Sequence, residues 1–66
     1  MIKVTRFNGQ ELAVNAELIQ FVEGTPDTVI TLTNKEKILV KESVDEVIKR
    51  IIEYRRSIHK TGEHLL

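Results

Sequence analysis

The segment that decides the fold is KESVDEVIKRIIEYRRSI, residues 41–58. Its apolar side chains recur at the i, i+3, i+4, i+7 spacing of a helix that covers a core with one face. The members of this stripe are Val44, Val47, Ile48, Ile51, Ile52 and Ile58, with Arg55 as the polar residue among them. The segment is therefore predicted to be an amphipathic helix of roughly 16 to 18 residues. The rest of the chain has to cover its apolar stripe.

Ser43 and Glu46 mark the start of this helix. A serine followed three residues later by a glutamate is a capping box, in which the serine hydroxyl accepts a hydrogen bond from the N3 amide and the glutamate reaches back to the cap amide. Asp45 precedes Lys49, and Glu46 precedes Arg50, by four residues, an order that favours ion pairs along the helix. At the other end, Gly62 is a residue that can terminate a helix, and fraying from about Ile58 is the alternative.

The residues before the helix alternate between short strand patterns and turn signals. Asn8-Gly9 is the strongest short signal for a two-residue type I′ hairpin, and Gly24–Asp27 and Asn34–Glu36 also have turn chemistry. Five strands are expected, at about residues 2–7, 10–14, 18–23, 28–33 and 37–41. Hairpin-linked strands followed by one helix predict an α+β fold. We expect a small antiparallel five-stranded meander, either an open curved sheet or a partly closed barrel, with one C-terminal amphipathic helix.

The phase of the alternation predicts which side chains form the core. The strands contribute Ile2, Val4, Leu12, Val14, Ile30, Leu32, Ile38 and Val40, and the helix contributes Val44, Val47, Ile48, Ile51 and Ile52. Residues 18–23 are apolar on both faces. The pattern alone leaves open whether Ile19 and Phe21 or Leu18 and Val22 point inward.

Apolar side chains that the helix does not cover predict an interaction surface. Contiguous exposed apolar area is uncommon on soluble monomers and usually marks an interface. We therefore expect a protein-interaction surface, or an interface between copies of the chain, drawn from Phe7, Leu18, Ile19, Phe21, Val22, Val29 and Leu39.

Length and charge narrow the functional classes. The 66 residues and the absence of cysteine predict one small domain without disulfides, covering residues 1–58 and followed by a short tail at residues 59–66. Ten Lys and Arg balance ten Asp and Glu, so the chain lacks the basic excess of a dedicated nucleic-acid binder. Arg55, Arg56 and Lys60 remain a weak candidate patch for docking an anionic partner.

No apolar run has the length of a membrane span and no signal-peptide core is found, which predicts a cytoplasmic protein.

Side chains that carry chemistry are few. His59, Glu63 and His64 do not have the spacing of a zinc site, and no thiolate completes one. The three glycines stand apart from one another and form no phosphate-binding loop. Ser43 has no base nearby in the sequence and is explained by its capping role. We therefore expect no enzymatic activity, no cofactor and no metal site.

Four segments resemble one known family. MIKVTRFNG (residues 1–9), NAELI (15–19), TPDTVITL (25–32) and VKESVDEV (40–47) are similar, in this order and spacing, to the FlbD/SwrD family of bacterial flagellar proteins. The resemblance extends from Met1 to about Arg56. The chain departs from the family pattern at Asn34-Lys35, where Asn-Gly is expected, and this leaves the type of that turn open.

The resemblance implies a cytoplasmic accessory protein of flagellar motility and swarming. Such a protein is expected to support the power of the flagellar motor by binding a stator protein or another motor component, near the inner face of the cytoplasmic membrane at the flagellar base. The resemblance transfers no catalytic or cofactor-binding residue. Two alternatives are a small RNA-binding regulatory barrel, which zero net charge and few aromatic residues disfavour, and a purely structural homo-oligomeric scaffold.

Overall fold

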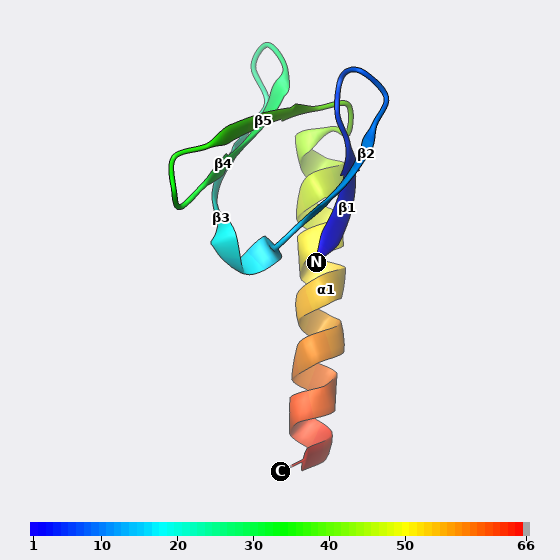
Figure 1. Ribbon diagram of the computed structural model, residues 1–66. Helices are drawn as coiled ribbons and strands as arrows, with labels where there is room; N and C mark the ends of the chain where they lie inside the picture. The colour runs from blue at the N-terminus through cyan, green and yellow to red at the C-terminus, as the bar shows by residue number, and fades with distance from the viewer. Residues whose placement is uncertain (66) are drawn as a thin grey trace.

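The computed structural model describes the backbone of residues 1–65 and the side chains of residues 1–58. The elements, in chain order, are β1 (Ile2–Thr5), β2 (Glu11–Val14), a 3-10 turn η1 (Ala16–Leu18), β3 (Ile19–Glu23), β4 (Thr28–Leu32), β5 (Lys37–Val40) and α1 (Val44–Leu65). Figure 1 shows the strands gathered around the first half of α1, and the second half of the helix extends beyond them. The predicted α+β class and the order of its elements are confirmed.

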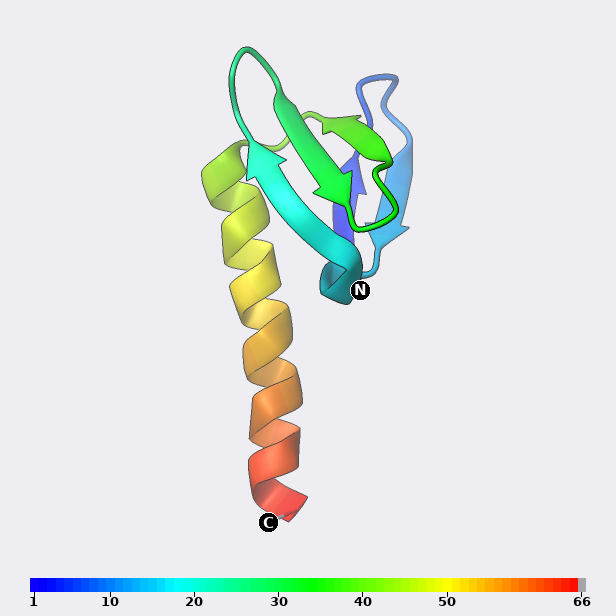
Figure 2. The same cartoon turned by 90° about the vertical axis from the view of Figure 1, so that its left-hand side faces the viewer.

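The five strands form two antiparallel sheets instead of one meander. β1 pairs with β2, and β3, β4 and β5 form a second sheet in that order. The chain turns a corner between the sheets, because the Asn15 side chain accepts a hydrogen bond from the Glu17 amide (3.0 Å) and caps η1. A single bridge between Arg6 and Val40 joins the end of β1 to the end of β5. The two sheets therefore curve around a shared interior, as Figure 2 shows, without forming one continuous ladder.

The β1–β2 hairpin has a three-residue loop, residues 7–9. The Arg6 amide donates to the Gln10 carbonyl (2.8 Å), and the Gly9 amide donates to the Arg6 carbonyl (2.9 Å). Only the last loop residue, Gly9, has positive φ (90°), whereas a type I′ turn at Asn8-Gly9 needs positive φ at both positions. The predicted type I′ turn is therefore wrong. The geometry is that of a longer loop ending in a left-handed residue.

The β4–β5 hairpin repeats this loop. The Leu32 amide donates to the Glu36 carbonyl (2.8 Å), and the Lys35 amide donates to the Leu32 carbonyl (2.9 Å). Lys35 has φ of 74° and occupies the position that Gly9 occupies in the first hairpin. Asn34 stabilises the loop by accepting a hydrogen bond from the Glu36 amide (3.0 Å). The turn type that Asn34-Lys35 left open is thus the same in both hairpins.

β3 changes its phase at an irregularity. Ile19 pairs with Leu32 and Phe21 pairs with Thr31, so the register shifts between them. An extra residue in one strand moves the following side chains to the opposite face. As a result Ile19 and Val22 both pack against the core, and neither of the two inward pairs expected from strict alternation occurs.

The core is smaller than predicted on its helical side. Buried apolar side chains come from both sheets, η1 and α1, and are Ile2, Val4, Val14, Ala16, Ile30, Ile38, Val40 and Val47. Leu12, Leu32, Ile51 and Tyr54 are partly buried and pack against them. Ile48 and Ile52 were predicted to be core residues but are 43% and 46% exposed. Ala16 was not predicted to be buried, because its burial depends on the corner at η1.

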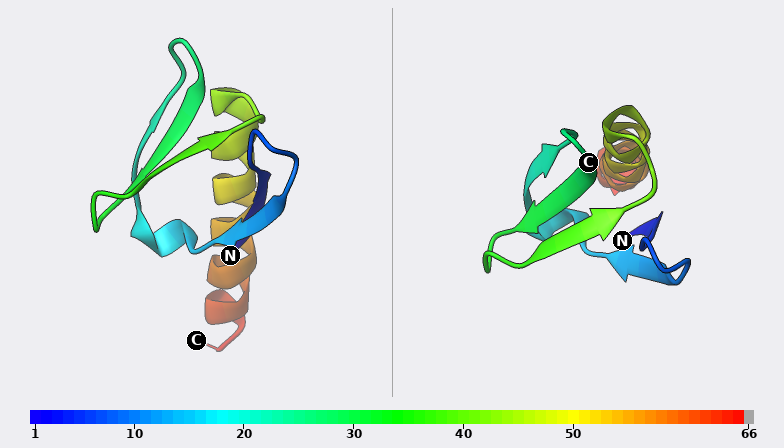
Figure 3. Two further views of the ribbon diagram at one scale, coloured as in Figure 1. Left: turned by 45° about the horizontal axis from the view of Figure 1, so that its top comes forward. Right: turned by 90° about the horizontal axis from the view of Figure 1, so that it is seen from above.

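α1 presents only one side of its apolar stripe to the sheets. Viewed from above in the right panel of Figure 3, the helix is seen end-on with both sheets on one side of it. Val47, Ile51 and Tyr54 lie on the packed side. Gly24 allows the β3–β4 turn to lie close to the first residue of α1, because a Cβ added at Gly24 would be only 2.5 Å from Val44 Cγ2.

The helix begins as predicted and ends later. Ser43 Oγ accepts a hydrogen bond from the Glu46 amide (3.1 Å), which confirms the serine half of the predicted capping box. The Glu46 carboxylate accepts a hydrogen bond from Arg50 Nε (3.0 Å) where the capping box predicted one from the Ser43 amide. The helix has 22 residues and continues to Leu65, beyond both expected ends at Ile58 and Gly62. Within the described chain, no helix is long and apolar enough to cross a membrane.

Candidate protein-interaction surface

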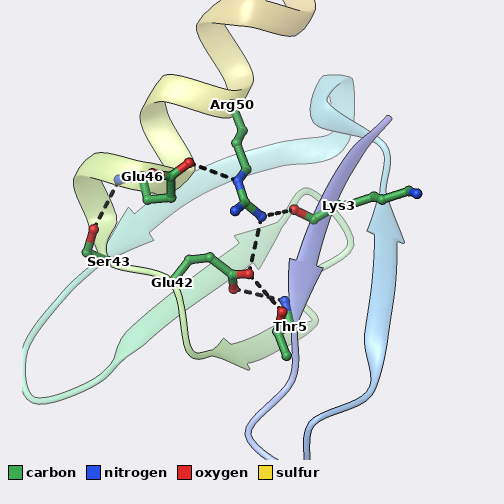
Figure 4. A network of polar contacts seen from close by, with 6 residues as sticks. All are labelled: Lys3, Thr5, Glu42, Ser43, Glu46 and Arg50. Carbon is green, nitrogen blue, oxygen red and sulfur yellow. Dashed lines mark hydrogen bonds and ion pairs between the residues drawn. The ribbon is translucent and has the colours of Figure 1, made fainter.

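A network of polar side chains fixes α1 against β1 (Figure 4). The Glu42 carboxylate accepts hydrogen bonds from the Thr5 amide (2.8 Å) and from the Thr5 hydroxyl (2.9 Å). Arg50 Nη1 lies 3.2 Å from Glu42 Oε2 and 2.6 Å from the Lys3 carbonyl oxygen, to which it donates a hydrogen bond. Arg50 Nε donates to Glu46 Oε2 (3.0 Å), which confirms the Glu46–Arg50 ion pair predicted along the helix. One guanidinium group therefore joins the first turns of α1 to the backbone of β1.

Glu42 is held in its ionised form. Its side chain is only 10% exposed. Burial alone would raise its pKa, but the hydrogen bonds from the Thr5 and Glu42 amides and the Thr5 hydroxyl, together with the positive charge of Arg50, outweigh that effect and lower the pKa below 4.5. A carboxylate whose oxygens already accept hydrogen bonds is a poor general base. The network positions the helix and offers no reactive group.

Sequence reasoning found only part of this network. The i, i+4 spacing revealed Glu46 and Arg50, because both lie on one helix face. The contact between Thr5 and Glu42 joins residues 37 positions apart, and no local pattern signals it.

The outer face of the β3–β4–β5 sheet carries three of the predicted interaction residues. Val29 pairs with Leu39 across β4 and β5, and Phe21 pairs with Thr31 across β3 and β4. Val29 and Thr31 are two residues apart on β4 and share a face, so Phe21 and Leu39 lie on that face as well. Phe21 is 56% exposed and Leu39 is 44% exposed. We call Phe21, Val29 and Leu39 the sheet patch.

The other predicted interaction residues lie elsewhere. Leu18 ends η1 and is exposed, whereas Ile19 and Val22 pack against the core. Phe7 is exposed in the β1–β2 loop, where it lines a groove of about 360 Å³ with Pro26, Asp27, Thr28, Val40 and Lys41. The seven residues therefore do not form one surface.

The weak basic patch is only partly described. Arg55 and Arg56 are exposed on α1, and the side chain of Lys60 lies outside the described residues. Arg56 shares an open helix surface with Asp45, Lys49 and Glu53, so acidic groups accompany it. The surface around Arg56 is therefore mixed in charge, and the anionic docking patch stays a prediction.

The described side chains offer no cluster of metal ligands. In that part of the chain no group of three or more His, Cys, Asp or Glu side chains is arranged to hold a metal ion. The side chains of His59, Glu63 and His64 fall outside it.

A second exposed apolar surface was missed by sequence reasoning. Ile48 and Ile52 form it together with the polar residues beside them on the outer side of α1. The sequence signal was present, because the apolar stripe is wider than a short sheet can cover. The spacing alone does not distinguish such a surface from a wide core-facing stripe.

Comparison with known proteins identifies a family. The model of a family described as flagellar and swarming motility proteins matches residues 1–59. No curated protein and no solved structure matches the chain significantly. The matched range contains every strand, most of α1, the sheet patch and the Thr5–Glu42–Arg50 network.

Proposed function

Because the chain belongs to the FlbD family of flagellar and swarming motility proteins, we propose that it is a non-enzymatic adaptor that supports the flagellar motor by binding a stator protein or another motor component. Its membership confirms the resemblance found in the sequence and assigns it a role in flagellar motility. We propose that it acts in the cytoplasm, at the inner face of the membrane near the flagellar base, where such a partner would be reached.

The sheet patch is the observation that supports partner binding most directly. Phe21 and Leu39 expose large apolar side chains on the face of β3–β4–β5 that points away from the core. The opposite face of this sheet is already buried in the shared core through Ile30 and Ile38. A few side chains at the centre of an interface commonly supply most of its binding energy, and aromatic residues are frequent among them.

The test replaces Phe21 by Asp in the flagellated host and measures swarming together with the motor proteins that copurify with the tagged chain. Phe7→Asp is the matched control, because Phe7 is an exposed aromatic residue outside the sheet patch. We expect Phe21→Asp to abolish both swarming and copurification of a motor component, and Phe7→Asp to retain them. Thermal unfolding of both purified variants shows whether the fold is intact.

The outcome separates three cases. A folded Phe21→Asp variant that still supports swarming and still binds its motor partner would show that the sheet patch is not the binding surface. Unfolding of this variant would assign Phe21 to the core, and Leu39→Asp then provides the second test of the same face. Loss of function in Phe7→Asp alone would move the binding surface to the groove beside Pro26 and Lys41.

A further inference from the structure

The outer side of α1 is an apolar surface without a partner in the described part of the fold. Ile48 and Ile52 are 43% and 46% exposed, although they lie one helical turn apart in the first half of the helix, beside the sheets. Figure 3 shows both sheets on one side of the helix, and the α1 side chains that pack in or against the core are Val47, Ile51 and Tyr54. The two isoleucines share one open groove with four charged residues, Asp45, Lys49, Glu53 and Arg56.

The charges in this groove alternate along the helix. Read from the N-terminal end, Asp45, Lys49, Glu53 and Arg56 are negative, positive, negative and positive. A second helix that runs in the opposite direction presents the same row in reverse order. Asp45 of one copy then meets Arg56 of the other, and Lys49 meets Glu53, so that each charge faces its opposite.

One symmetry axis brings all of these pairs together. The midpoint between positions 45 and 56 and the midpoint between positions 49 and 53 both fall at residues 50–51 of the helix. Ile48 of one copy and Ile52 of the other are related by almost the same point. A twofold interface requires that if one residue contacts a second, the second also contacts the first, and this row of residues meets that condition.

We propose that the chain forms an antiparallel homodimer through the outer face of α1, with Ile48 and Ile52 at its centre and the Asp45–Arg56 and Lys49–Glu53 pairs beside them. A parallel arrangement is excluded by its own charges, because it places each charged residue opposite an identical one. The second half of α1 extends beyond the sheets and leaves room for the partner helix (Figure 2). The interface is narrow, and the dimer therefore dissociates on dilution.

The first experiment measures mass against concentration by analytical ultracentrifugation of the full chain. We expect the wild-type chain to change from monomer to dimer as its concentration rises. Ile48→Asp should weaken the dimer by about a hundredfold or more, because it introduces an unpaired carboxylate from each copy.

Leu39→Asp is the matched control for this experiment. Leu39 is 44% exposed on another surface, so its replacement should leave the dimer unchanged. A wild-type chain that stays monomeric at the highest soluble concentration overturns the proposal. Loss of the dimer in Leu39→Asp but not in Ile48→Asp also overturns it.

A charge-exchange experiment tests the antiparallel register and does not depend on the apolar variant. Lys49→Glu places the new carboxylate of each copy opposite Glu53 of the other, and Glu53→Lys places the new ammonium group of each copy opposite Lys49 of the other. Each variant alone should dimerise about tenfold more weakly than the wild-type chain. Mixing the two variants restores opposite charges across the interface and should restore association as a 1:1 heterodimer.

The mixture also separates association from helix stability. Lys49 and Glu53 are four residues apart on the same helix, so either single variant creates a like-charge pair within its own chain. Mixing leaves that pair in place and changes only the contacts between chains. The antiparallel register itself is tested by the weakening of each single variant, because in a parallel dimer the change only replaces one like-charge pair between the chains by another. Recovery of the dimer in the mixture supports the proposed contact through positions 49 and 53. A mixture that associates no better than its components refutes it.

Discussion

Lys35 provides a quantitative test of the hairpin geometry. It is exposed, and its φ of 74° lies in the left-handed region, which the equivalent residue of the first hairpin, Gly9, occupies with φ of 90°. This conformation costs a residue with a Cβ about 1 to 2 kcal/mol. Glycine avoids that cost but loses about 0.5 to 1 kcal/mol more conformational entropy on folding. The difference predicts that Lys35→Gly raises the free energy of unfolding by about 0.5 to 1 kcal/mol.

In a domain of this size that gain corresponds to a rise in Tm of about 2 to 8 °C. The reciprocal change is Gly9→Ala, which should lower the free energy of unfolding by the same difference, about 0.5 to 1 kcal/mol. A Cβ at Gly9 meets no heavy atom within 4 Å, so no steric clash adds to this backbone effect. Urea unfolding with an unchanged m-value is the appropriate assay. If Lys35→Gly proves neutral or destabilising while Gly9→Ala behaves as expected, the argument from backbone strain fails at Lys35.

Two further predictions concern α1 and its attachment. Glu42 has a lowered pKa in the folded chain, so its contribution to stability is complete above pH 4.5 and is lost as the pH falls through the lower folded value. Glu42→Gln should therefore lower the free energy of unfolding by about 1 to 3 kcal/mol at pH 7, and the free energy of unfolding of this variant should fall less than that of the wild-type chain on acidification. The exposed control Glu11→Gln should show neither effect. Parallel curves of unfolding free energy against pH for the wild-type chain and Glu42→Gln would contradict this. Val47→Ala should cost about 1 to 3 kcal/mol because Val47 is fully buried, and Ile48→Ala should cost less than about 1 kcal/mol in dilute, monomeric protein. A larger loss at Ile48 would show that the outer side of α1 is covered within the monomer.

Local signals predicted most of the architecture. The cap at Ser43, the Glu46–Arg50 pair and the order of strands, turns and helix all depend on residues within four positions of each other. Such signals act through the geometry of one turn or one helix face and need no knowledge of the rest of the fold. The corner at Asn15 belongs to the same class, because its side chain caps η1 locally.

Features that depend on distant contacts could not be predicted from the pattern. The irregularity after Ile19 shifts which side chains of β3 face the core. A prediction that assumes strict inward and outward alternation cannot locate such a shift. The hydrogen bond from Thr5 to Glu42 joins β1 to the segment just before α1, and these residues are 37 positions apart in the sequence. Periodicity likewise shows that Ile48 belongs to the apolar stripe of α1. How much of the width of this stripe the sheets cover depends on how closely they approach the helix, and the spacing does not show that.

The two exposed apolar surfaces belong to different elements, so binding of a motor partner and formation of the dimer can be tested separately. The sheet patch lies on β3–β4–β5, and the proposed dimer surface is built from exposed residues of α1. A twofold dimer through α1 would present two sheet patches on one particle. Two linked sites raise the effective affinity for an assembly that repeats the same binding partner. Under the two proposals, Phe21→Asp should abolish partner binding and leave the dimer intact. Ile48→Asp should retain binding to a single partner molecule and lose only the gain from two linked sites.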